Sequence, residues 1–181
     1  MTRITLVTPT DATGPVEQTF AEIKSAFGVV PNMFRAVANS PAALVSMWGS
    51  FGALGGGGLG ARLGEQIAVA IADRNNCNYC LAAHTVLGRK AGASAQEMAE
   101  AQAGRSSDPR AQAALAFAVK VVGSRADVAA SDVDALRAAG FDDGEVVEII
   151  AHVALNLFTN YVNVALAVPV DFPSVKLRHA A

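Results

Sequence analysis

Cysteine, charge and aromatic side chains are all scarce in this chain. Two cysteines among 181 residues exclude a disulfide-rich scaffold, whose small core needs several bridges. Charged residues reach only 17% against 52% apolar residues, which excludes an intrinsically disordered chain. Because the formal net charge is -2 and no basic run is interleaved with aromatic residues, we expect no binding to nucleic acid or to an anionic membrane.

A long uninterrupted hydrophobic run is missing as well. The most apolar stretch, residues 146–170, is broken by Glu148, His152 and three asparagines, which predicts a core or interface helix instead of a membrane span. The first residues lack the apolar segment of a secretory signal peptide. We therefore expect a cytoplasmic protein. In that compartment a lone C-x-x-C motif indicates redox or metal chemistry more often than a structural bridge.

Strand patterns are absent, whereas apolar residues recur at helical spacing between prolines and glycines that mark the helix ends. Ser94 and Glu97 are expected to form a capping box, and Ser131 or Asp132 to cap a later helix. A chain of this length suits one domain. The sequence thus predicts an all-α, single-domain helical bundle over residues 1–181. Its helices are expected at about residues 15–27, 31–38, 41–51, 63–74, 77–91, from 94 onward, 108–122, 131–139 and 145–166.

One glycine-rich run contains a G-x-G-x-x-G pattern at Gly55, Gly57 and Gly60. In a dinucleotide site this pattern follows a strand and places the pyrophosphate at a helix N-terminus. A helix is expected before the run here, so the pattern predicts a mobile loop and no nucleotide site.

The stretch that carries chemistry is Cys77-Asn78-Tyr79-Cys80-Leu81-Ala82-Ala83-His84. On a helix, Cys77, Cys80 and His84 fall within about 60° of one another, so two sulfurs and an imidazole share one face. Cysteines at this spacing can close a disulfide where the backbone fits, and a nearby imidazole can take a thiol proton to give the reactive thiolate. Redox chemistry is the favoured interpretation.

Two other interpretations of this cluster are a set of inert buried cysteines and a zinc site. A structural zinc site needs a fourth ligand, and the remaining histidines, His152 and His179, lie far away in the sequence. We expect His152 to be a core or interface histidine and His179 to be solvated. No metal ion and no cofactor are expected.

Two further side chains lie close enough in sequence to join the cluster. Glu65 precedes Cys77 by twelve residues. A helix, a short turn at Asn75-Asn76 and a returning helix would bring its carboxylate back over the cysteine helix, although an isolated glutamate at such a position is more often a solvated charge. Tyr79 is either a core aromatic residue or a hydrogen-bond partner at the site.

The spacing Glu65-x11-Cys77-x2-Cys80-x3-His84 resembles the signature of alkylhydroperoxidase D-like proteins, in the carboxymuconolactone decarboxylase superfamily. Residues 30–34 with 38–41, and residues 160–163 leading to 171–173, are similar to the branch called peroxidase-related. The resemblance implies an all-helical fold that assembles into trimers or hexamers.

The same resemblance implies a peroxidase. In such proteins a relay formed here by Glu65 and His84 helps to ionise a cysteine, the thiolate attacks an organic hydroperoxide, and the resulting sulfenic acid condenses with the second cysteine. A dithiol reductant, borne by a lipoyl or thioredoxin-like protein, then resets the pair. The best-characterised members have a second histidine directly before the second cysteine, where this chain has Tyr79. Alternatives are a lyase resembling the carboxymuconolactone decarboxylases and a non-catalytic, redox-sensing oligomer.

We expect Glu65, Cys77, Cys80 and His84 to converge on one pocket, with Cys77 at a helix N-terminus. A helix terminus stabilises a charge by up to about 1 kcal/mol at exposed sites. A positioned base, such as His84 one turn after Cys80, contributes about 10²–10⁴-fold where it acts. This comparison favours Cys80 as the attacking thiol and Cys77 as its resolving partner and the more exposed sulfur.

Overall fold

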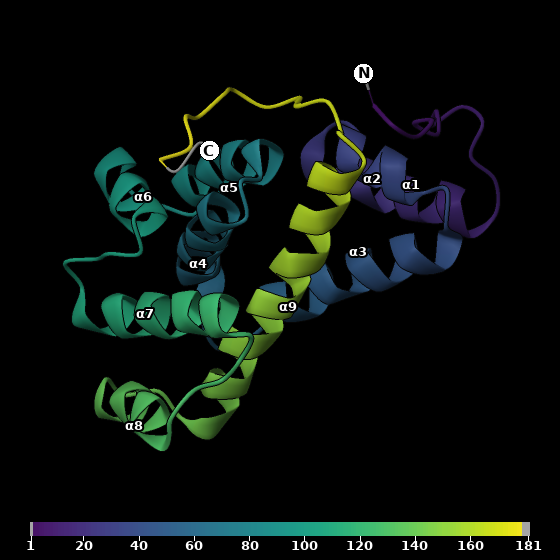
Figure 1. Ribbon diagram of the computed structural model, residues 1–181. Helices are drawn as coiled ribbons and strands as arrows, with labels where there is room; N and C mark the ends of the chain where they lie inside the picture. Colours follow the sequence, from purple (N-terminus) through teal and green to yellow (C-terminus); the bar gives the residue numbers. More distant parts are fainter. Residues whose placement is uncertain (1, 179–181) are drawn as a thin grey trace.

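The computed structural model describes residues 2–178. These residues form nine helices joined by turns and loops, and no strand (Figure 1). The predicted all-α fold is therefore confirmed. The helices are α1 (Pro15–Phe27), α2 (Asn32–Val37), α3 (Pro41–Gly55), α4 (Gly60–Arg74), α5 (Asn78–Lys90), α6 (Ala95–Gln102), α7 (Pro109–Ser124), α8 (Ala130–Ala138) and α9 (Asp143–Ala165). None of these helices is both long enough and apolar enough to cross a bilayer.

Most helix ends lie where local signals predict them. Ser94 and Glu97 form the expected capping box at the start of α6. The expectation for α8 is wrong in detail, because its N-cap is Ala129. Asp132 acts from inside the first turn, where its carboxylate accepts a 2.7 Å hydrogen bond from the Ala129 N–H. A carboxylate can satisfy an unpaired N–H group from either position, so the sequence alone leaves the boundary open.

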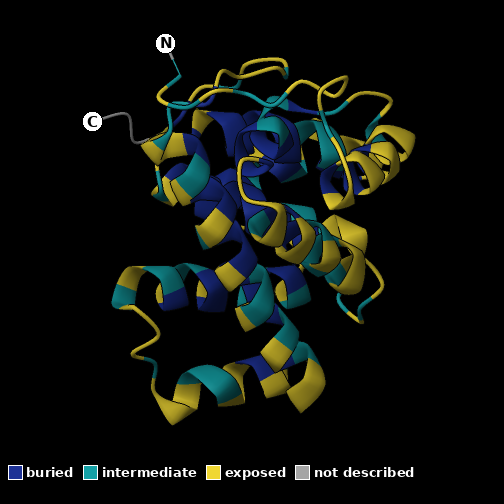
Figure 2. Ribbon diagram, turned by 90° about the vertical axis from the view of Figure 1, so that its right-hand side faces the viewer, coloured by how far each residue is buried: buried dark blue, intermediate teal, exposed yellow. Residues whose placement is uncertain are grey.

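The core is built around α4, which packs against α5, α6, α7 and α9. Its central residues, Ile67 to Asp73, are all buried. Helix α9 crosses the molecule beside α4, with α3 on its other side, while α7 and α8 extend away from the most deeply buried region (Figures 1 and 2). Burying a side chain the size of Ile or Leu contributes about 1.5–3 kcal/mol, so this arrangement makes the α4–α5 hairpin a rigid base for polar groups.

The turn between α4 and α5 fixes the start of α5 against α9. Asn76 adopts a left-handed conformation with φ of 52°, which asparagine tolerates better than most residues. The Asn75 side-chain amide donates a 2.9 Å hydrogen bond to Asn160 Oδ1 on α9. Cys77 therefore begins α5 at a point held by both helices.

The glycine-rich run is anchored to α9. The Glu148 carboxylate on α9 accepts hydrogen bonds from the backbone N–H groups of Gly58 (3.0 Å) and Leu59 (3.1 Å), directly before α4. A Cβ at Gly57 would lie 2.7 Å from the same carboxylate, so a side chain there would displace Glu148 from its present position. A side chain distant in sequence thus occupies the position that an anion would take, a contact that the sequence did not predict.

The segment after α9 returns over the top of the molecule toward α6 (Figure 1). It is fastened by the hydrogen bonds from Gln102 Nε2 to the Lys176 carbonyl (3.0 Å) and from the Arg178 N–H to Asp73 Oδ1 (2.9 Å). This return places residues 169–172 next to the start of α5.

Candidate functional site

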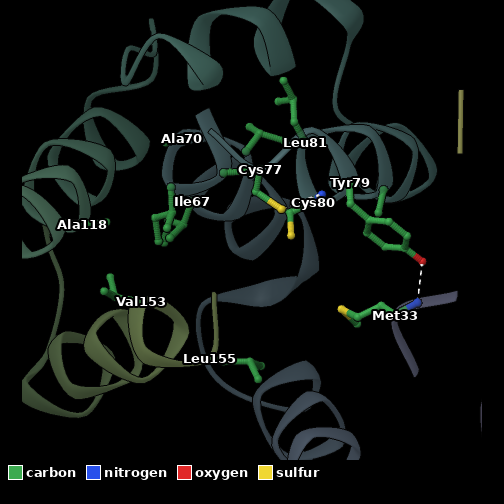
Figure 3. Close-up of a cluster of buried hydrophobic side chains, with 14 of the residues drawn as sticks. Met33, Ile67, Ala70, Cys77, Tyr79, Cys80, Leu81, Ala118, Val153 and Leu155 are labelled. Atoms are coloured by element: carbon green, nitrogen blue, oxygen red, sulfur yellow. Dashed lines mark hydrogen bonds between the residues drawn. The ribbon is translucent and has the colours of Figure 1, made fainter. Parts of the chain in front are cut away.

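The two cysteines form one interacting unit at the start of α5. Cys77 is the N-cap residue, as predicted, and its Sγ accepts a 3.2 Å hydrogen bond from the Cys80 N–H. Both thiols are free, and their sulfur atoms lie side by side (Figure 3). The two residues are only 1% and 2% exposed, so the expectation that Cys77 is the more exposed sulfur is wrong.

Glu65 and His84 are in direct contact. The Glu65 Oε2 atom lies 2.7 Å from His84 Nδ1, and the Glu65 and His84 side chains are 21% and 10% exposed. The interpretation of Glu65 as a solvated charge is therefore wrong. The turn at Asn75-Asn76 sends α5 back along α4, which brings the carboxylate onto the imidazole as the hairpin prediction requires.

This environment favours an ionised Cys80. Burial would raise the pKa of the Cys80 thiol, but the hydrogen bond from Cys77, the positive charge of His84 and the side-chain amides of Asn163 and Asn160 outweigh it and lower the pKa to about 7. Burial likewise acts to lower the pKa of His84, yet the adjacent Glu65 carboxylate and Cys80 raise it above the ordinary value. Each group thus stabilises the charge of the other.

Cys77 is the protonated member of the pair. Its hydrogen bond to Cys80 is the largest cause of a raised pKa, and burial acts in the same direction. When one proton is shared between two adjacent sulfurs, the negative charge resides on the sulfur that has more hydrogen-bond donors around it. Cys80 has these donors, since Asn163 Nδ2 lies 3.2 Å from its Sγ.

The asparagines of α9 are site residues that the sequence analysis did not assign. Asn160 and Asn163 lie beside Cys80, while Asn156, one turn earlier on the same face of α9, bonds the His152 carbonyl; all three are at most 4% exposed. The sequence signal for these residues was a set of amides that interrupt an apolar helix at intervals of four and three residues. Burying an amide is costly unless it has a function or a hydrogen-bond partner.

A cavity of about 280 Å³ opens above Cys80. Cys80, His84 and Glu65 line it, whereas Cys77 does not, so three of the four residues expected in one pocket share it. The rest of its wall is mostly aromatic and apolar. These wall residues are Phe27, Pro31, Met33, Phe34, Trp48, Phe51, Gly52, Tyr79, Ala83, Leu87 and Phe172.

Tyr79 fills both of the roles that the sequence left open. Its ring lines the cavity and meets Phe172 edge-on, with 5.6 Å between ring centroids. Its hydroxyl oxygen accepts a 3.2 Å hydrogen bond from the Met33 N–H, drawn as a dashed line in Figure 3. Burial raises the pKa of this phenol. Tyr79 therefore joins α5 to α2 and to the returning C-terminal segment.

The zinc interpretation finds no support within residues 2–178, where no group of three or more His, Cys, Asp or Glu side chains could hold a metal ion. His152 is partly buried and packs against Gly64, as expected of a core histidine. It also lines a cavity of about 100 Å³ behind Glu65 and His84. His179 lies outside the described residues.

Comparison with known proteins agrees with this geometry. The model of the carboxymuconolactone decarboxylase family matches residues 41–120, which include the whole α4–α5 hairpin. No protein with curated annotation matches the chain significantly.

Solved structures extend the likeness to nearly the whole chain. A peroxidase-related protein with an alkylhydroperoxidase core from Ralstonia eutropha JMP134 has a TM-score of 0.86 at 26% identity, over 94% of this chain and 92% of that one. A peroxidase-related protein from Silicibacter sp. TM1040 has a TM-score of 0.82 at 26% identity, over 93% and 91%. The debrominase Bmp8, solved with 2,3,4-tribromopyrrole, has the same fold at 24% identity, with a TM-score of 0.79 over 94% of each chain.

The family model thus matches the segment that carries the cysteine pair, and the fold of the chain is similar to that of the alkylhydroperoxidase-like, peroxidase-related proteins, in line with the resemblance seen in the sequence.

Proposed function

We propose that this protein is a thiol-dependent peroxidase that reduces apolar organic hydroperoxides with Cys77 and Cys80. One observation carries the proposal. A thiol whose pKa is lowered to about 7 borders an apolar cavity, while a second thiol is hydrogen-bonded to it. A thiolate is the form that attacks peroxides, and an adjacent thiol completes the oxidation to a disulfide.

The reaction is a two-step oxidation of the cysteine pair. The Cys80 thiolate attacks the terminal peroxide oxygen, the O–O bond breaks, and the departing alkoxide takes a proton to leave as the alcohol. Cys80 becomes a sulfenic acid. The Cys77 sulfur then attacks the Cys80 sulfur, a disulfide forms, and the hydroxyl leaves as water.

His84 and Glu65 supply the proton in the first step. The imidazole is protonated next to the thiolate and is held in place by the Glu65 carboxylate 2.7 Å away. A donor that is already charged and oriented lowers the barrier to departure of the alkoxide. Tyr79, with its raised pKa, positions the cavity wall and takes no part in proton transfer.

A steady-state peroxidase assay tests the proposal. We expect turnover of cumene hydroperoxide to exceed that of hydrogen peroxide, because the cavity wall is apolar. Dihydrolipoamide and thioredoxin serve as alternative dithiol reductants and identify the kind of partner. Cys80→Ser is expected to abolish turnover, and a sulfenic-acid trap should label Cys77→Ser but not Cys80→Ser after one equivalent of hydroperoxide. Labelling of Cys80→Ser alone would exchange the two roles.

A second candidate reaction is reductive dehalogenation of an aromatic ring. Six aromatic wall residues favour a flat apolar ring in the cavity, and the debrominase Bmp8 has the same fold. The thiolate would accept the halogen, Cys77 would displace halide to give the disulfide, and the ring would gain a proton. Release of bromide from 2,3,4-tribromopyrrole without peroxide turnover would favour this reaction.

The remaining alternatives give different outcomes in the same experiments. A lyase of carboxymuconolactone decarboxylase type would retain its activity after loss of both cysteines. A redox sensor would form the disulfide once, without turnover, and would change its oligomeric size.

A further inference from the structure

A second cavity, of about 380 Å³, borders the cysteine pair on the side of Cys77. Cys77, Asn76, Asn78, Asn163, Val164 and Val170 are among the residues that line it. Cys80 does not line this cavity, just as Cys77 does not line the cavity above Cys80. Each cavity is therefore bordered by a different cysteine of the pair.

We propose that this second cavity is the binding site for the reductant, an uncharged aliphatic dithiol that attacks the sulfur of Cys77 while the hydroperoxide uses the other cavity. The inference rests on the proposed disulfide cycle and adds to it a separate entrance and a defined point of attack.

The chemistry of exchange favours the same sulfur. A thiolate of the dithiol attacks Cys77 Sγ, a mixed disulfide forms, and Cys80 leaves as a thiolate. The second thiol of the reductant then closes its own disulfide, and Cys77 leaves and takes up a proton. Exchange is faster when the leaving thiol has the lower pKa. The Asn163 amide and the positive charge of His84 stabilise an anion at Cys80 independently of the Cys77 thiol proton, so attack at Cys77 expels the better leaving group.

The lining of the cavity defines the class of reductant. No Lys, Arg, Asp or Glu occurs among its lining residues, which are amides, aliphatic side chains and Tyr79. Glutathione carries two carboxylates that would find no counter-charge there. An uncharged chain can bury its methylene groups against Val164 and Val168 and place its polar atoms near the amides.

The test separates the two half-reactions. Val170→Trp narrows the second cavity, since Val170 lines it and is 44% exposed. Val29→Trp is the matched control, because Val29 is also an exposed valine outside the helices, at 62%, and lines neither cavity. Each variant is oxidised with one equivalent of hydroperoxide to time the oxidative step. A second sample is oxidised with diamide and then mixed with dithiothreitol to time the reductive step.

We expect Val170→Trp to slow the reductive step by about tenfold, equivalent to about 1.4 kcal/mol, and to leave the oxidative step within about twofold of wild type. Val29→Trp should change neither step. A Val170→Trp variant that is reduced at the wild-type rate, or that slows both steps equally, would overturn the proposal. Because diamide forms the disulfide without a hydroperoxide, this result is independent of whether the protein is a peroxidase.

A second measurement locates the attacked sulfur. Oxidised protein is treated briefly with 2-mercaptoethanol, quenched in acid, alkylated and fragmented in a mass spectrometer. We expect the mercaptoethanol adduct on Cys77 and the alkyl group on Cys80, and the reverse pattern would refute the assignment. Glutathione should react more slowly than 2-mercaptoethanol after correction for thiol pKa; an equal or faster rate would refute the uncharged class of reductant.

Discussion

At the scale of single residues, the pair of thiols is asymmetric although both are buried to the same extent. Cys80 has an amide donor from α9, a protonated imidazole and the thiol of Cys77 around it, while Cys77 is held mainly by its cap hydrogen bond. The sequence predicted the motif and its helix face because those depend on spacing. It did not predict Asn163, because contact between residues 83 positions apart depends on how α9 packs.

Removing the amide donor should make Cys80 less reactive. We expect Asn163→Ala to raise the pKa of Cys80 by about one unit or more, because a hydrogen bond to a charged group contributes about 1.5–3 kcal/mol. The pH dependence of alkylation by iodoacetamide measures this shift. Asn156→Ala is the control, since Asn156 is buried on the same helix but its amide bonds the His152 carbonyl. Equal alkylation profiles for the wild type and Asn163→Ala would contradict the assignment.

Neutralising Glu65 should narrow the pH range of activity. In the wild type, activity rises as pH passes about 7, where Cys80 loses its proton, and falls where His84 loses its own at a raised pKa. Glu65→Gln removes the charge that raises the His84 pKa, so the alkaline limb moves to lower pH. A less protonated imidazole stabilises the thiolate less, so the acid limb moves up. The profile of kcat/KM against pH measures both limbs, and an unchanged profile would remove Glu65 from the relay.

At the scale of helices and loops, local signals place most boundaries but not the partners of their ends. Pro15, Pro41 and Pro109 each lie at a helix start, and Gly28 ends α1 in a left-handed conformation. These helix ends were predictable from the sequence alone. The contact of the glycine-rich run with Glu148 was not predicted, because that partner is about 90 residues away. An anion-binding pattern can be satisfied within the chain as well as by a ligand.

Loss of this carboxylate should loosen the start of α4. We expect Glu148→Gln to destabilise the protein by about 1–2 kcal/mol, because two backbone donors lose a charged acceptor at a helix N-terminus. Hydrogen exchange at the Gly58 and Leu59 amides should accelerate, and chemical denaturation gives the free energy of unfolding. Glu17→Gln, at an exposed position of α1, is the control and should change the free energy of unfolding by less than about 0.5 kcal/mol. Unchanged exchange at both amides would contradict the anchoring role.

At the scale of the whole molecule, the site combines the α4–α5 hairpin with segments distant in sequence, and α1 to α3 supply most of the aromatic wall. Helices α4 and α5 supply Glu65, His84 and the cysteines, α9 supplies its amides, and the returning segment closes the cavity with Phe172. The hairpin was predictable because one short turn connects its helices. The two cavities were not, since each is a gap between elements whose relative placement no local pattern encodes.

One surface of α9 is apolar and exposed within residues 2–178. Val147, Ile150, Phe158 and Tyr161 are 36–65% exposed along a helix of 23 residues, about 35 Å long. Apolar side chains in such a row mark an interaction surface more often than scattered single residues do. We expect a homo-oligomer with closed symmetry, a trimer or a hexamer, in which this row packs against a neighbouring protomer.

Light scattering coupled to size-exclusion chromatography tests this assembly against the chain mass of 18.6 kDa. We expect a mass of three or six chains at micromolar concentration. The double variant Val147→Asp and Tyr161→Asp should have a measured mass closer to that of a single chain, because an unpaired carboxylate is costly to bury at an interface. Val29→Asp places the same charge on an exposed valine outside α9 and should leave the assembly intact. A wild-type mass of one chain would refute the prediction. A stable oligomer that survives both α9 charges would assign the interface to another surface, and the exposed row on α9 would then need a different partner.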